Sequence, residues 1–196
     1  MRRTTRILPV VTVALFVAAC SSGGSSKSSG SATTLPPLPA SDLWSLIAFP
    51  PAPFEPVTDA PSAVLELGNK DAKEVSLPFT NEAELSKAGF QRGWESVFGT
   101  PDGAVVIIDV LAFATPAGPI ALQKQFLAHA GPQRRTIKDV PAVVELGRSP
   151  KGRAALSTAF AAGRFLVVIT VGGPPDEHDY TKLMNDLVHE QAANLP

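Results

Sequence analysis

Residues 104–113 read AVVIIDVLAF, a run of ten in which Asp109 is the single charged side chain. Apolar and β-branched residues at consecutive positions are typical of a strand covered on both faces. Residues 99–103, GTPDG, precede this run and end in Asp-Gly, a strong signal for a hairpin turn. The sequence therefore predicts a central strand over 104–113 whose antiparallel partner is formed by residues 92–98.

A second hairpin is predicted further along the chain. Residues 154–160 and 165–171 are rich in small and β-branched side chains and flank the short turn AAGR at 161–164. Residues 135–140 and 142–146 are weaker strand candidates. Residues 142–147 read AVVELG and resemble AVLELG at 63–68. This similarity would be consistent with an internal duplication.

Three helices are predicted around these hairpins. Asn81 followed by Glu84 forms a capping box, with Gly89 closing a short helix through residue 88. Thr115-Pro116 begins a second helix, for which we expect one packed side made of Ile120, Gln123, Phe126, Leu127 and Ala130. The third begins near Asp176 and carries a clear amphipathic stripe of Tyr180, Leu183, Met184, Leu187, Val188 and Gln191.

The order of these elements decides the fold class. Hairpins interrupted by single helices lack the regular alternation of strand and helix that builds parallel sheets. We therefore predict an α+β domain, an antiparallel sheet of hairpins with helices packed on it.

Residues 1–19 have the composition of an export signal. Three arginines precede thirteen residues, 7–19, that are almost wholly apolar. Such a run is too short to cross a bilayer, which needs about 20 residues, and it is typical of a cleaved signal peptide. Its end, Val17-Ala18-Ala19-Cys20, resembles the lipobox of bacterial lipoproteins, which implies that Cys20 carries diacylglycerol and a further acyl chain, such as palmitate, and begins the mature protein.

Two stretches rich in serine or proline lie between the export signal and the predicted helices and strands. Residues 20–39, the lipidated cysteine and a Ser/Gly/Pro-rich segment, are predicted to form a disordered tether. Residues 40–61 combine prolines with apolar residues and are expected to form an extended collar packed along the domain, with a short helix allowed at 41–47. The predicted globular domain spans residues 40–196.

Charge and cysteine content exclude several classes of function. The chain carries 17 basic and 18 acidic residues, and without residues 1–19 its net charge is −4, which argues against binding to nucleic acid. A single cysteine excludes an internal disulfide and a cysteine-cluster metal site. We expect no cofactor. Membrane attachment should depend on acyl chains rather than on charge.

Four segments resemble a group of small, uncharacterised actinobacterial lipoproteins. They are residues 51–59, LSKAGFQRGW at 85–94, residues 106–118, which end in FATPAG, and GRFLVVI at 163–169. The resemblance implies no particular activity. It loosely implies an α/β/α sandwich of the Mog1/PsbP-like kind.

The candidate functional residues are few. Trp44, Phe49, Phe54 and Trp94 are aromatic residues that could line a ligand groove, and Asp109 interrupts an apolar strand, where a carboxylate needs a partner such as Arg92 or Arg164. No nucleophile motif is present. We therefore expect a non-enzymatic binding or sensing lipoprotein on the extracytoplasmic face of the cell membrane, with an envelope lipid or a protein as partner. The alternatives are an envelope enzyme that uses Asp109 and a structural spacer.

Overall fold

The computed structural model describes residues 34–57, 63–68, 77, 79–129, 134–140, 143–148, 154–174 and 180–196. The predicted signal peptide, Cys20 and most of the predicted tether lie outside these residues. The elements follow the chain in this order: α1 (Ala40–Trp44), β1 (Glu55–Pro56), β2 (Ala63–Leu65), α2 (Glu82–Lys87), β3 (Phe90–Gly99), β4 (Val105–Phe113), α3 (Ala117–His129), β5 (Arg134–Thr136), β6 (Val143–Arg148), β7 (Ala154–Ala162), β8 (Phe165–Gly173) and α4 (Tyr180–Asn194).

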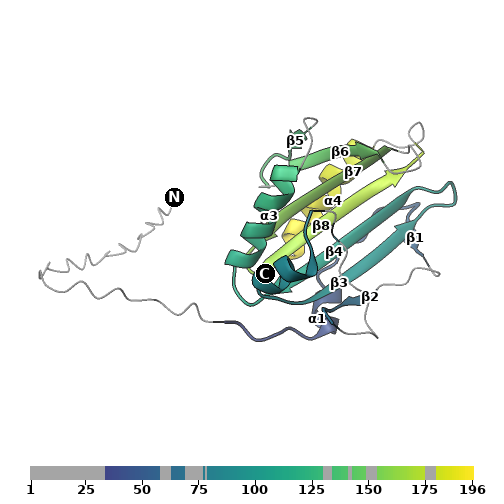
Figure 1. Ribbon diagram of the computed structural model, residues 1–196. Coiled ribbons are helices and arrows are strands. Elements are labelled where there is room, and N and C mark those ends of the chain that lie inside the picture. Colours follow the sequence, from purple (N-terminus) through teal and green to yellow (C-terminus); the bar gives the residue numbers. More distant parts are fainter. Residues whose placement is uncertain are drawn as a thin grey trace, which may run out of the picture. The chain divides into compact units, whose positions relative to one another are not determined.

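The strands form one antiparallel sheet of eight strands, in the order β1-β3-β4-β8-β7-β6-β5, with β2 also paired to β3. Both predicted hairpins are present, as β3–β4 and β7–β8. The two hairpins meet in the middle of the sheet, where β4 and β8 pair from Val105–Gly172 to Ala112–Phe165. The predicted α+β class is confirmed (Figure 1).

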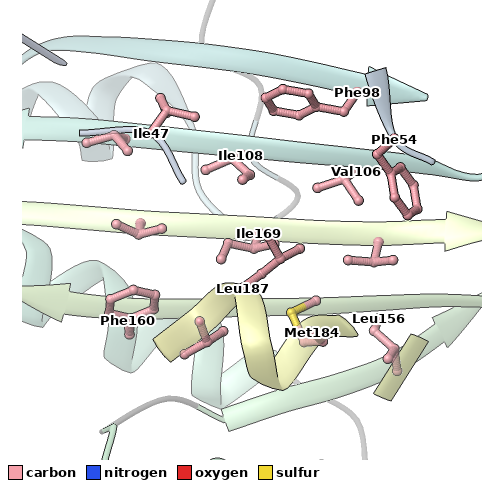
Figure 2. Close-up of a cluster of buried hydrophobic side chains, with 14 of the residues drawn as sticks. Ile47, Phe54, Phe98, Val106, Ile108, Leu156, Phe160, Ile169, Met184 and Leu187 are labelled. Carbon is pink, nitrogen blue, oxygen red and sulfur yellow. The ribbon is translucent and has the colours of Figure 1, made fainter. Parts of the chain in front are cut away.

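Helices cover both faces of the sheet. On one face, Val106 and Ile108 of β4 pack in a buried cluster with Met184 and Leu187 of α4 (Figure 2). This cluster also takes in Leu43 of α1 and side chains of the residues that follow it. The face therefore carries α1 and α4 together.

The other face of the sheet packs against α2 and α3. Leu111 and Phe113 of β4 form a second buried cluster with Leu122 and Phe126 of α3. Leu85 of α2 belongs to the same cluster. The two clusters alternate along β4 because successive side chains of a strand point to opposite faces.

The three predicted helices are present, with one difference in how they pack. The capping box at Asn81 is formed in both directions with Glu84, and α4 buries all of its predicted stripe except Leu183, which is half-buried. The packed side predicted for α3 was partly wrong: its buried residues are Gly118, Pro119, Leu122 and Phe126. Ile120, which we placed on that side, is 46% exposed.

The weak internal repeat falls at matching places in the sheet. Residues 63–65 form β2, which pairs with β3 of the first hairpin, and residues 143–148 form β6, which pairs with β7 of the second. A helix follows each hairpin. Each half of the sheet thus contains a hairpin flanked by one strand of the repeat, with β1 and β5 as additional strands, and the halves meet between β4 and β8.

The part of the predicted tether that the structure describes, residues 34–39, lies on the domain. The Leu35 N–H donates to the Ala114 carbonyl (2.9 Å), and the Leu35 carbonyl accepts from Gln91 Nε2 (2.8 Å). Arg164 Nη1 donates to the Pro36 carbonyl (2.7 Å). Residues 35 and 36 are therefore bound to the domain, several residues before the start at residue 40 that the composition suggested.

The collar packs against the sheet as predicted, and its helix α1 is shorter than residues 41–47. The collar is joined to α4 by Gln191, which is fully buried. Gln191 Oε1 accepts from the Ala48 N–H (2.8 Å) and Gln191 Nε2 donates to the Leu46 carbonyl (2.6 Å). Residues 58–61 of the predicted collar lie outside the described residues.

Candidate binding surfaces

Three of the four candidate aromatic residues come together on the face that carries α1 and α4. The rings of Trp44 and Phe49 meet edge to face, with centroids 5.3 Å apart, and the Trp44 ring lies 6.0 Å from that of Trp94. Phe49 also contacts Phe98 at 5.6 Å. Trp44 is 38% exposed and Phe49 is 49% exposed. We call Trp44, Phe49, Trp94 and Phe98 the collar aromatic cluster.

Trp94, which is half-buried, supplies the base of this cluster. Its indole Nε1 is inaccessible to solvent and has no hydrogen-bond partner among the residues that the structure describes. An unpaired buried donor costs about 1–3 kcal/mol, so this N–H weakens the packing that the large ring provides. Beside it on the same strand, Arg92 forms an ion pair with Glu66 (Nη2–Oε1, 2.6 Å).

Phe54, the fourth aromatic candidate, is part of the core. It is 9% exposed and lies in the cluster between the sheet and α4 (Figure 2). Its role in the structure is therefore packing.

Asp109 lies on the opposite face of the sheet from the collar aromatic cluster. In the β3–β4 register Trp94 faces Val110, and Glu95 faces Asp109. Neighbouring residues in a strand point to opposite faces. Asp109, which is half-buried, therefore cannot share a site with Trp94.

Each of the two arginines that we expected to pair with Asp109 binds a different group in the structure. Arg92 is on the other face of the sheet, where it binds Glu66. Arg164 is in the β7–β8 turn, where it binds the Pro36 carbonyl and lies 5.8 Å from the centroid of the Phe165 ring.

Arg164 also lines an apolar groove of about 500 Å³. Its walls come from four parts of the chain: residues 35–38, Pro116 before α3, the β7–β8 turn with Phe165, and Pro196. Arg164 is only 9% exposed, so the groove offers hydrocarbon contact and little accessible charge. Sequence reasoning missed this groove because residues 35–38 have the composition of a linker.

A second cavity, of about 420 Å³, lies between α2 and α3. It is lined by small residues, by the charged Glu84 and Lys87, and by Gln125. Gln125 Oε1 is buried and has no partner within the described part of the chain. The helices approach closely at this point, where Gly118 of α3 faces the Ala88 backbone.

The histidines of the described residues serve local structure. His129 Nδ1 bonds the Gln125 carbonyl (2.8 Å). His189 is exposed, and its ring nitrogens bond the Asn185 and Lys138 carbonyls, each at 2.8 Å. In the described part of the chain, no group of three or more His, Cys, Asp or Glu side chains could hold a metal ion.

Comparison with known proteins identifies a fold but no family. No protein-family model matches the chain, and no curated protein matches it. One solved structure that does match is the extracellular domain of PknH from Mycobacterium tuberculosis, with a TM-score of 0.56 and 11% sequence identity. The match covers 81% of this chain and 96% of that domain. At this identity the match shows only that the two chains share a fold, which in PknH is the fold of an extracellular domain.

No helix within the described residues combines the length and the apolar character needed to span a membrane.

Proposed function

We propose that this chain is a lipoprotein of the cell envelope whose domain acts by binding or sensing rather than by catalysis. Residues 1–19 act as the signal peptide, and Cys20 carries the lipid that holds the protein on the extracytoplasmic face of the membrane. The only cysteine of the chain directly follows the apolar run of the signal, and the fold is shared with an extracellular domain. Both observations support this location.

The observation that carries the binding role is the apolar groove beside Arg164. A ligand pocket is typically a concave, mostly apolar space of roughly 300–1,000 Å³, and the groove has a volume of about 500 Å³. The one charged side chain among its lining residues, Arg164, is largely buried and already bonded to the Pro36 carbonyl. These properties favour the hydrocarbon part of an envelope lipid as the ligand.

The anchor is tested by labelling expressing cells with a radioactive fatty acid. Wild-type protein should carry the label and partition into the detergent phase, and Cys20→Ala should do neither. An unlabelled wild-type protein would refute the lipoprotein proposal.

The ligand is tested by native mass spectrometry and solvent extraction of the full mature protein. Wild type should retain a lipid mass, and Leu35→Glu at the groove rim should lose most of it. Ile120→Glu is the matched control, because Ile120 is 46% exposed against 42% for Leu35 but does not line the groove. No bound lipid, or equal retention by both variants, would refute binding in the groove.

A further inference from the structure

The large exposed hydrophobic residues concentrate near the start of the domain. In the part of the chain that the structure describes, they are Leu35, Trp44, Phe49 and Ile120. Three of the four lie within residues 34–49, and Trp44 and Phe49 contact each other. The surface formed by Trp44 and Phe49 is the subject of this inference.

Trp44 and Phe49 are held firmly from beneath. Between them in sequence, Ile47 is buried in the core beneath α1, and Gln191 fixes the backbone at Leu46 and Ala48. Trp94 and Phe98 support the two rings from the sheet. The exposed pair is therefore a rigid projection, with its side-chain geometry set before anything binds.

The segment that carries the pair offers no basic side chain for electrostatic binding. Residues 34–57 contain two acids, Asp42 and Glu55, and no lysine or arginine, and the nearby Arg92 is already paired with Glu66. Contact through this surface is therefore expected to come from aromatic and apolar groups. Tryptophan and phenylalanine of this kind favour the boundary between lipid headgroups and acyl chains.

The position of the pair along the chain identifies the occupant. Leu35, near the start of the described residues, is 15 residues after Cys20, and a chain of that length reaches at most about 50 Å when fully extended. A protein anchored at Cys20 would therefore hold this part of the domain no farther than that from the bilayer. We propose that Trp44 and Phe49 dock the domain on the membrane by inserting into the lipid interface, an inference that rests on the proposed lipid anchor.

The two tryptophans of the chain permit a direct test. Full mature protein is reconstituted in phosphatidylcholine vesicles whose acyl chains carry bromine, a contact quencher of tryptophan fluorescence. Trp94→Phe leaves Trp44 as the only indole, and Trp44→Phe leaves Trp94. We expect Trp44 emission to fall at least twofold and Trp94 emission to change little, with no effect of raising the salt from 0.05 to about 0.5 M.

A pair of matched substitutions in the Trp94→Phe protein checks the surface itself. Phe49→Glu should abolish most of the quenching of Trp44. Ile120→Glu should not, although Ile120 is exposed to nearly the same extent, 46% against 49%. Circular dichroism of each variant confirms that the domain remains folded.

Co-flotation with the vesicles separates this inference from the proposed function. Flotation with strong Trp44 quenching supports both. If the protein floats but Trp44 is quenched no more than Trp94, membrane docking is overturned and the lipid anchor stands. The exposed pair would then be a surface for a protein partner. Wild-type protein that does not float overturns the anchor and, with it, the docking.

Discussion

Gln191 is the side chain whose replacement should most clearly separate the collar from the domain. It is fully buried, and its amide makes two hydrogen bonds to backbone groups of the collar, accepting from Ala48 N–H (2.8 Å) and donating to Leu46 C=O (2.6 Å). Methionine at this position would keep the volume and the apolar contacts. It would remove both hydrogen bonds.

The expected cost follows from the burial of the two backbone groups. Ala48 is fully buried, so its N–H would be left without a partner, at about 1–3 kcal/mol. Leu46 is half-buried, so water can reach its carbonyl and the loss there is about 1 kcal/mol. Gln191→Met should therefore lower the free energy of unfolding by about 2–4 kcal/mol. For a domain of this size, that lowers Tm by roughly 6–12 °C.

The assay is urea denaturation of the full mature protein, followed by circular dichroism and by tryptophan fluorescence. Because Trp44 belongs to the collar and its ring contacts that of Trp94 in the sheet, loosening of the collar should change fluorescence at lower urea than it changes the dichroism of the sheet. Glu190→Met is the control, at an exposed neighbouring position of α4, and should stay within about 0.5 kcal/mol of wild type. A Gln191→Met protein as stable as this control would refute the reasoning.

Substitutions at three further positions test the structure elsewhere. Trp94→Phe should change the free energy of unfolding by less than about 1 kcal/mol, since it removes an unpaired buried N–H. Trp94→Ala should lower it by about 3–5 kcal/mol. Equal losses of the two variants in thermal denaturation would contradict this account. Gly118→Ala should cost about 1–3 kcal/mol, because the added methyl group would clash with the Ala88 carbonyl, and an unchanged Tm would show that α2 and α3 can move apart. Asn81→Ala removes the acceptor for the Glu84 N–H (3.0 Å) and should cost about 1 kcal/mol in denaturant titration, while Glu82→Ala, exposed on the same helix, serves as its control.

Local signals explain what could be predicted. The hairpins follow from β-branched runs on either side of short turns, and the turn at residues 99–103 closes by bonds within itself, such as Gly103 N–H to the Thr100 carbonyl (3.0 Å). The capping box depends on residues three apart. The stripe of α4 correctly included Gln191, although the pattern could not show which groups its amide would bind.

The packed side of α3 was partly mispredicted because its sequence carries little contrast. Residues 117–129, AGPIALQKQFLAH, include a single lysine as their only fully charged side chain. Apolar residues lie almost all round the helix, so periodicity cannot select one side. The contact with β7, β8 and α2 decides which side is buried.

The sequence by itself determined the principal helices, the two hairpins and the α+β class, because those depend on residues near one another in the chain. Only the tertiary structure decided that β4 pairs with β8, that Trp44 meets Trp94 while Asp109 lies on the other face, and that Leu35 and Pro36 belong to the folded unit. Those outcomes depend on contacts between segments far apart in sequence. Such contacts form only when the whole sheet assembles and its two faces are buried together, which no local pattern encodes.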